Sequence, residues 1–419
     1  MNNLGLGINV IGYIDGEFGL GEAVRLNLKA MESVDLPYVK IDYLKLNKKT
    51  INESVFKYNI NLIQLSLNDI SDFFAKFKAS SFLKNRYNIL FLVWESEYVP
   101  EEIQKVLHLF HEIWTPSSYC CEIFRQHFLG PVMTVPHPVE VELTPLIEND
   151  FLKIYDKQKY SFLFIFNFGS SIKRKNTLFL IQSFIEAFPV ENDAELIIKC
   201  SNAKKNPKDY ALVLKEIGTR TNIKLIDIDL DKNDLNHFIN QCDCYISLHH
   251  SEGFGLTLAE SMYLGKPTIA TNYSGNLEFM NDQNSFLVDY VTNSIEEPDV
   301  NFCEKTIWAD PLLADSVNKM RLVCNNRVLA SEKAKKAQID TQNKLSYKSV
   351  GSKIAKRVES IIRNFKNSDE DKMLLISYKS RIIELEMELK KIKKSKVIAC
   401  VLGVKQLLRN VKSKYKKVN

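Results

Sequence analysis

The stretch from Asp243 to Asp282 constrains the fold more than any other part of the chain. It begins with a short apolar run, residues 244–248, which is typical of a buried strand, and a loop with two glycines follows it. Apolar residues at helical spacing then predict a helix over Thr257–Leu264, which Gly265 is placed to end before a second strand. This order is typical of parallel α/β sheets, in which ligands bind at the carboxyl ends of the strands and a helix N-terminus attracts phosphate.

Two glutamates lie at different depths in this stretch, Glu252 in the loop and Glu260 inside the helix. Their carboxylates can accept hydrogen bonds from hydroxyl groups on two parts of one extended ligand. A nucleoside diphosphate sugar, with a sugar at one end and a ribose at the other, has this shape. Either glutamate alone is also explained as a charge at a helix N-terminus or on a solvated face. The whole stretch is poorly explained in that way, because it also contains Glu-Gly-Phe-Gly-Leu, Gly-Lys-Pro and Ser-Gly-Asn, with seven residues between the two glutamates.

The pattern of strands and helices repeats along the 419 residues, which exceed one typical domain. One alternation begins at Ile8, and a second begins at Tyr160 after a polar stretch, residues 140–159, that predicts an interdomain linker. We therefore expect an α/β protein with two Rossmann-like domains that face a cleft, followed by a helical basic tail. The predicted segments are residues 1–145, residues 155–345, a closing helix at 346–366 that packs back on the first domain, and the tail at 367–419.

Glycines in the first alternation predict a loop that closes over a ligand. Gly19 and Gly21 lie between the first strand and a helix, as in a dinucleotide-binding fingerprint, although Val24 stands where its third glycine would be. Asp42 follows the next strand, where that fingerprint places a ribose-binding acid. A plain tight turn also explains the pattern. We favour a loop over a phosphate or sugar and disfavour nicotinamide binding.

Three further candidates follow strands of the first half, where they are expected to line the cleft. Trp94 and Glu95 come directly after the apolar run 88–93, and His137 comes after Val132–Val135. Packing is the competing interpretation for a lone histidine or tryptophan.

A basic loop follows the first strand of the second half. Arg174 and Lys175 lie in it, and Lys199 lies at the end of the next strand. We expect these cations opposite the helix start near Gly253, where they would neutralise a diphosphate leaving group without a metal ion. A solvated run of charges is the alternative.

Two patterns resemble metal sites, and we expect neither to bind metal. Asp227, Asp229 and Asp231 follow a strand with the spacing of an Asp-x-Asp motif, and carboxylate oxygens suit Mg²⁺ or Mn²⁺. Because they lie between the basic loop and the glutamate pair, solvated loop carboxylates are the favoured interpretation. His249 and His250 lack the His-Glu-x-x-His spacing of a zinc site.

The basic charge is concentrated at the end of the chain. The net charge is +5, but residues 372–419 carry 14 Lys and Arg against three Glu. Residues Leu375 to Ile392 have coiled-coil spacing, which predicts self-association. The apolar stripe after Val397 predicts a basic amphipathic helix on an anionic membrane surface, with a solvated helix or a packing partner as the alternative. Nucleic acid is not expected, because no basic module with interleaved aromatic residues accompanies the charge.

The spacing of the cysteines and the length of the apolar runs indicate the cellular compartment of the protein. The eight cysteines have no disulfide-dense spacing and are expected to be reduced thiols. No basic leader is recognised at the N-terminus, and no apolar run approaches the ~20 residues that span a bilayer. We therefore predict a cytoplasmic protein that is peripheral at the inner face of the cell membrane.

With these residues the chain resembles a family-4 glycosyltransferase with the two-domain glycosyltransferase-B fold, over about residues 5–362. The resemblance rests on Glu252 to Glu260 with its Gly-Phe-Gly insert, on Arg174-Lys175-Asn176, on Gly19 to Ala23 and on Trp94-Glu95. It is greatest to bacterial enzymes that assemble surface polysaccharides such as O-antigen. It implies retaining transfer of a sugar from a nucleotide-sugar donor to a glycan or lipid-linked glycan, with no metal ion and no other cofactor.

The resemblance also implies roles for the donor-side residues. Glu252 would bind hydroxyl groups of the donor sugar, and Glu260 would bind the ribose. Arg174 and Lys175 would stabilise the departing diphosphate, and Gly21 would let the first domain approach it. Backbone N–H groups of the glycine loop and helix start would hold the sugar and phosphate; the donor-binding candidates there are Gly253, Phe254, Gly255 and Leu256.

The acceptor side is less defined by the resemblance. Trp94 and Glu95 are its candidates, and His137 or Glu95 would stand where many family members hold a cleft residue against the sugar. We count His137 among the catalytic candidates on this basis.

No carboxylate pair is placed as nucleophile and acid, so we expect same-face substitution in which the leaving phosphate helps to remove the acceptor's proton. A nucleotide-sugar epimerase on the same fold is an alternative, and its product would be an isomerised nucleotide sugar. A non-catalytic sugar-binding scaffold is a third possibility, against which the two glutamates and the cationic loop argue.

Overall fold

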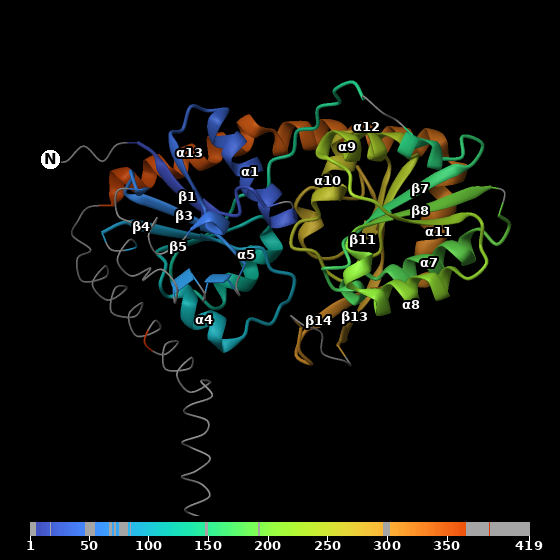
Figure 1. Cartoon of the computed structure of the whole chain (residues 1–419), viewed down its shortest axis with the longest axis horizontal. Helices are drawn as coiled ribbons and strands as arrows, with labels where there is room; N and C mark the ends of the chain where they lie inside the picture. Colours follow the sequence, from blue (N-terminus) through green and yellow to red (C-terminus); the bar gives the residue numbers. More distant parts are fainter. Residues whose placement is uncertain are drawn as a thin grey trace, which may run out of the picture.

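The computed structural model describes residues 6–365 except 17, 47–54, 67–68, 71–72, 75–82, 84, 147–149, 192 and 296–301, together with residue 385. Two six-stranded sheets with flanking helices lie side by side in this part of the chain (Figure 1). The predicted α/β architecture with two Rossmann-like halves is therefore confirmed. The exact domain boundaries stay predictions.

The N-terminal sheet has the strand order β2-β1-β3-β4-β5-β6, and all its neighbouring strands are parallel. Consecutive residues of β1 point to opposite faces of the sheet and belong to different hydrophobic clusters, Val10 to one and Ile11 to the other. Both faces of this sheet are therefore covered. The strands are β1 Ile8–Gly12, β2 Tyr38–Asp42, β3 Ile60–Gln64, β4 Tyr87–Phe91, β5 Glu112–Thr115 and β6 Val132–Thr134. The helices are α1 Gly19–Glu32, α4 Glu101–Leu107 and α5 Ser118–Arg125.

The C-terminal sheet has the strand order β12-β11-β10-β7-β8-β9 and is also parallel. Its strands are β7 Tyr160–Ile165, β8 Ala194–Cys200, β9 Ile223–Asp227, β10 Cys244–Ser247, β11 Thr268–Thr271 and β12 Phe286–Val288. The helices are α6 Ile172–Lys175, α7 Thr177–Ala187, α8 Pro207–Ile217, α9 Lys232–Gln241, α10 Leu256–Tyr263 and α11 Leu313–Asn325. An antiparallel hairpin of β13 Tyr290–Ser294 and β14 Ile307–Pro311 follows β12.

Two long helices connect the C-terminal half back to the N-terminal one, α12 Arg327–Leu345 and α13 Tyr347–Asn364 (Figure 1). α13 packs against α1, and an added Cβ at Gly351 would overlap Ala30 O, so the two helices need glycine at this crossing. Arg357 of α13 also pairs with the fully buried Glu112 at 2.6 Å. Burial of an apolar face together with this ion pair holds α13 on the N-terminal half.

The predicted coiled-coil seam and membrane-binding helix, within residues 367–419, lie outside the described residues apart from Leu385. Within the described part, every helix is too short or too polar to cross a lipid bilayer.

Candidate functional site

The carboxyl ends of β7 and β10 bring the basic loop and the glutamate loop together. Ser171 caps α6, because its Oγ accepts a hydrogen bond from Arg174 N at 3.1 Å. Asn176 then ends α6 in the left-handed conformation, and its side chain donates to Leu248 O at 2.9 Å. His250 N donates to Arg174 O, also at 2.9 Å. The two loops thus form one hydrogen-bonded unit.

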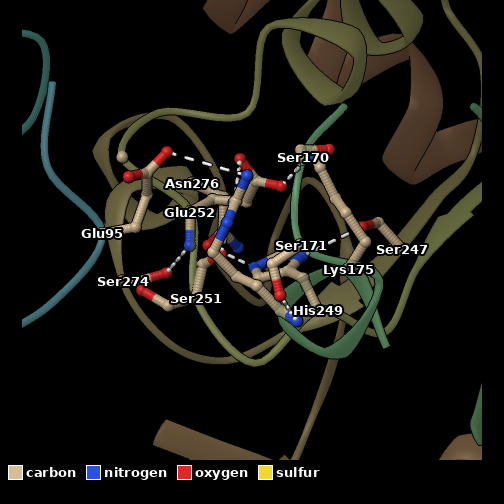
Figure 2. A network of polar contacts seen from close by, with 12 residues as sticks. Glu95, Ser170, Ser171, Lys175, Ser247, His249, Ser251, Glu252, Ser274 and Asn276 are labelled. Atoms are coloured by element: carbon tan, nitrogen blue, oxygen red, sulfur yellow. Dashed lines mark hydrogen bonds and ion pairs between the residues drawn. The ribbon is translucent and has the colours of Figure 1, made fainter. Parts of the chain in front are cut away.

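An ionic cluster joins the buried side chains of Glu252 and Arg174 with the partly buried Lys175 and Glu95 (Figure 2). Arg174 Nη1 lies 3.3 Å from Glu252 Oε2, and Arg174 Nη2 lies 3.7 Å from Glu95 Oε1 of the N-terminal half. Lys175 Nζ pairs with Glu252 Oε1. Burial raises the pKa of Glu252, but the charges of Lys175 and Arg174 outweigh it and lower the pKa to about 2. An ionised carboxylate and two cations can bind hydroxyl groups and anionic oxygens, respectively.

His249 holds the loop that carries Glu252. Its ring is fully buried, with Nδ1 3.0 Å from Ser247 Oγ and Nε2 3.1 Å from Asn276 Oδ1. Burial lowers the pKa of His249 to about 4, so the ring is neutral at pH 7. Because an amide oxygen only accepts, Nε2 carries the proton. Glu252 N also donates to Ser274 Oγ at 2.8 Å, so side chains beyond β11 fix the glutamate loop (Figure 2).

Cavity I, of about 560 Å³, lies beside the ionic cluster between the two halves. Ser170, Ser171 and Arg174 line it from the C-terminal half. Its N-terminal wall combines polar and apolar side chains: Leu20, Gln64, Leu65, Ser66, Phe91, Val93, Trp94, Glu95, Tyr98, Pro100 and Ile103. The structure therefore places the two predicted acceptor-side residues, Trp94 and Glu95, in one cavity with Arg174.

Glu260 lines a different cavity, cavity II, of about 520 Å³. Its carboxylate is buried and pairs with Lys232 at the start of α9. Burial lowers the pKa of Lys232, but the charge of Glu260 outweighs burial and raises it. Lys29 of α1 and Tyr347 of α13 line the cavity from the other side, so cavity II also lies between the halves.

The first turn of α1, which contains Gly19 and Gly21 and is called the glycine turn below, lies between the two cavities, so the two glycines lie inside the helix and not in the predicted loop before it. Leu20 lines cavity I, whereas Glu22, two residues later, lines cavity II. Arg25 donates to Ile14 O at 3.1 Å and to Gly16 O at 2.8 Å, which holds the loop before the turn against α1. A ligand that extends from cavity II to cavity I would pass this turn.

Gly21 and Gly19 offer a matched pair of substitutions in the turn. An added Cβ at Gly21 would clash with Gly16 O and lie 3.0 Å from Tyr13 O, whereas one at Gly19 would meet nothing within 4 Å. We expect Gly21→Ala to lower the free energy of unfolding by about 1–3 kcal/mol and Gly19→Ala to change it by less than about 1 kcal/mol. Urea denaturation measures both values. Equal stability of the two variants would contradict the close approach at Gly21.

The loop after Glu252 contacts the N-terminal half. Ser117 Oγ donates to Gly253 O at 2.7 Å, and an added Cβ at Gly253 would clash with Val93 Cγ1. Phe254 is buried, and its ring meets His137, which follows β6 of the N-terminal half, edge to face at 5.2 Å. Gly253 and the Phe254 side chain therefore contribute to packing between the halves.

The start of α10 remains the candidate anion-binding element of this loop. Gly255 caps the helix with a φ of +90°, a conformation that favours glycine. Leu256 begins the helix, whose first N–H groups have no partner within it. Binding of phosphate there stays a prediction.

The prediction that His137 faces the cleft is wrong. Its side chain is 2% exposed, stacks on Phe91 with ring centroids 5.3 Å apart, and lines neither cavity I nor cavity II. Burial lowers the pKa of His137 to about 3, so the ring is neutral at pH 7. The physical reason is that β6 ends at Thr134, and the next residues carry His137 away from the strand end into aromatic packing.

Lys199 is also placed differently from the expectation. β8 lies two strands from β10 in the sheet, and Lys199 lines neither of the two cavities. Burial lowers the pKa of Lys199, and the charges that oppose this effect are Asp229 and Asp227 near the end of β9. Its charged neighbours are thus aspartates and not the cluster around Glu252.

The aspartate-rich loop is exposed. Asp227, Asp229 and Asp231 all face solvent, and Asp231 caps α9 by accepting from Asp234 N at 2.8 Å. Among the described residues, no group of three or more His, Cys, Asp and Glu side chains is arranged to hold a metal ion.

Sequence reasoning missed several residues that the structure brings to the site. Lys232, the partner of Glu260, directly follows the aspartate-rich loop and is the first residue of α9. Ser117 follows β5, as Lys232 follows β9. The rule that selected Trp94, namely that residues after a strand end line the cleft, would therefore also have selected Ser117 and Lys232. Phe302 and Cys303 near the hairpin also line cavity I, and no motif marks them.

Comparison with known proteins supports the fold. Residues 157–296 match the family model of glycosyl transferases group 1. HepE from Anabaena, solved in complex with UDP and glucose, superimposes with a TM-score of 0.60 at 14% identity, covering 85% of this chain and 100% of HepE. Sucrose-phosphate synthase from Thermosynechococcus elongatus gives a TM-score of 0.64 at 12% identity, covering 86% of this chain and 100% of that one. The predicted glycosyltransferase-B fold is confirmed.

One relative found by sequence comparison also resembles this chain, over part of the relative's length. The chain is 28% identical over 191 residues to sucrose synthase 1 from Hordeum vulgare, which is 41% of this chain and 23% of that relative. The chain thus matches less than a quarter of the relative's length. The resemblance to glycosyltransferases is confirmed, while membership of family 4 and a link to O-antigen stay predictions.

Proposed function

We propose that this protein is a retaining hexosyltransferase that moves a sugar from a nucleotide-sugar donor to a glycan or lipid-linked glycan in surface-polysaccharide assembly, without a metal ion. The observation that carries the proposal is the placement of the two glutamates. Glu252 lies in the ionic cluster beside cavity I, Glu260 lines cavity II, and the glycine turn lies between the cavities. The family match over residues 157–296 includes both glutamates and both cations.

This arrangement suits a donor that lies across the interface. The nucleoside would occupy cavity II, where Glu260 accepts hydrogen bonds from the ribose hydroxyls. The diphosphate would pass the glycine turn and meet the N-terminus of α10. The sugar would then reach Glu252 at the edge of cavity I. UDP in the HepE structure supports a nucleotide of this class.

The cations supply the charge that departure of the diphosphate requires. As the bond between the sugar and the phosphate oxygen breaks, the electron pair stays on the phosphate, and Arg174 and Lys175 stabilise the added negative charge. The acceptor hydroxyl attacks the same face of the sugar from cavity I, and its proton passes to the leaving phosphate. Packing of the halves against each other limits the access of water, which would otherwise hydrolyse the donor.

A thermal-shift panel of UDP-, GDP-, ADP- and dTDP-sugars tests the proposal. A ligand that binds only the folded state at a hundred times its Kd stabilises it by about 2.7 kcal/mol, so the responding compound identifies the donor. Product analysis with that donor should then yield a nucleoside diphosphate and a lengthened glycan. An isomerised nucleotide sugar would instead establish the epimerase, and a panel without any response would refute the donor site.

Deletion of residues 372–419 tests the proposed peripheral location on the cytoplasmic face of the membrane. The basic tail is expected to bind anionic lipids, so the shortened protein should no longer sediment with membranes. Transfer to a soluble acceptor should persist, because the residues that line cavities I and II all lie before residue 348. Unchanged sedimentation would refute the role of the tail.

A further inference from the structure

Cavity III, of about 640 Å³, borders cavity I at the interface of the two halves. Tyr98 lines both cavities. The segment 302–307 also borders both: its first two residues line cavity I, and Lys305 and Ile307 line cavity III. The two cavities are therefore neighbours across one ridge, which consists of Tyr98 and the segment 302–307.

The ridge is built from both halves of the protein. Ser96 and Thr306 approach to 3.2 Å through their buried hydroxyl groups, and Lys305 Nζ lies over the Tyr98 ring at 5.3 Å from its centroid. Trp308, on the following strand β14, stacks on His250 with ring centroids 5.0 Å apart. The ridge is thus attached to the loop that carries the ionic cluster.

The opposite wall of cavity III is formed by α5, and it is tied to the C-terminal half. Ser118 donates to Glu278 through its backbone N at 2.8 Å and through its hydroxyl at 2.7 Å. Tyr273 OH donates to Glu97 at 2.7 Å and lies 3.4 Å from Tyr119 OH. These contacts fix the geometry of the cavity in the observed arrangement of the halves.

The chemistry of cavity III suits a saccharide. Two tyrosines, Tyr98 and Tyr119, line the cavity together with polar side chains, and aromatic rings can pack against the C–H groups of a sugar. Carboxylates accept hydrogen bonds from hydroxyl groups, an amide both donates and accepts, and an ammonium donates. The polar side chains of this kind are Glu97, Glu122, Gln126 and Lys305. A lipid chain would need a continuous apolar wall, whereas the aliphatic side chains here are Ile123 and Ile307.

We propose that cavity III is a second saccharide subsite, which binds the glycan unit next to the unit in cavity I. The acceptor is then an oligosaccharide of at least two sugar units that crosses the ridge at Tyr98. The inference rests on the proposed function, because that function assigns cavity I to the acceptor.

Binding of a saccharide library to the full-length protein tests the subsite. The probes are unbranched mono-, di- and trisaccharides of glucose, galactose, mannose, rhamnose and N-acetylglucosamine, each measured with and without saturating UDP. At least one disaccharide is expected to bind about tenfold more tightly than its terminal monosaccharide, a difference of about 1.4 kcal/mol. A library in which no second unit improves affinity would overturn the proposal.

The double variant Glu122→Ala/Gln126→Ala tests whether the affinity gained from the second sugar unit comes from cavity III. Both side chains are exposed on α5 or at its end, so the fold should be retained. The gain in affinity from the second unit should fall to less than about threefold, while monosaccharide affinity stays unchanged. Leu129→Gln is the matched control, because Leu129 is 99% exposed, close in sequence and lines none of the three cavities.

A second variant keeps the test independent of α5. Ile307→Gln alters the other wall and should also reduce the gain from the second unit. Retention of the full gain in both variants would overturn the subsite. Failure of the proposed function is recognised separately, by a nucleotide-sugar panel without response or by an isomerised product.

Discussion

Glu252→Gln is expected to reduce the kcat/KM of sugar transfer by about 10²–10³-fold and the free energy of unfolding by about 3 kcal/mol. The substitution keeps the shape of the side chain but removes the charge that Arg174 and Lys175 share. Lys175 then loses its carboxylate partner, Arg174 retains Glu95 at 3.7 Å but loses the nearer carboxylate, and the donor sugar loses an ionised acceptor for its hydroxyl groups. Transfer is measured with the donor that the thermal-shift panel identifies, and stability is measured by urea denaturation.

The pH dependence of stability provides a control for this interpretation. The pKa of Glu252 falls from an ordinary value of 4.5 to about 2 in the folded protein. A lowered pKa contributes stability that is complete above about pH 4.5 and is lost as the pH falls towards 2. The stability difference between the wild type and Glu252→Gln should therefore shrink over this range. Glu186→Gln, at an exposed position on α7, should show no such change, and a constant difference for Glu252→Gln between pH 7 and pH 3 would refute the ionic cluster.

The glutamate stretch shows why much of the fold was predictable. The expected helix Thr257–Leu264 is α10 Leu256–Tyr263, and the expected strand 244–248 is β10 Cys244–Ser247. These signals are local, since a continuous apolar run defines a doubly covered strand and glycine marks the helix ends. Because β7 and β10 are adjacent and parallel, their carboxyl ends share one edge of the sheet. The cluster of Glu252 with Arg174 and Lys175 follows from that topology.

The remaining features of the site depend on packing between segments that are distant in sequence. His137 and Lys199 each follow a strand, as the site residues do, but one turns into aromatic packing and the other lies two strands away. Sequence position after a strand therefore gives the edge of the sheet and not the direction of the side chain. The ridge at Tyr98 depends on a hairpin that meets the other half of the protein, a contact that no local pattern encodes.

Gly275→Ala is expected to damage the site as severely as a change at Glu252, although Gly275 carries no functional group. Gly275 N donates to Glu252 O at 2.8 Å. An added Cβ would overlap the backbone carbonyl of Gly253 and lie 2.7 Å from Glu252 O. Since these neighbours are backbone atoms, the glutamate loop must move, and overpacking of this kind costs about 1–3 kcal/mol.

Displacement of the loop also alters two contacts that position the site. Glu252 N would shift from Ser274 Oγ, and Gly253 O would shift from Ser117 Oγ of the N-terminal half. Because a misplacement of about 1 Å costs about 10²-fold in rate, kcat/KM for transfer should fall by at least that factor. Leu129→Gln is the control, because the Leu129 side chain is 99% exposed and lines none of the three cavities. If Gly275→Ala transferred sugar at the rate of Leu129→Gln, the tight contact between the two loops would not be what holds Glu252 in place.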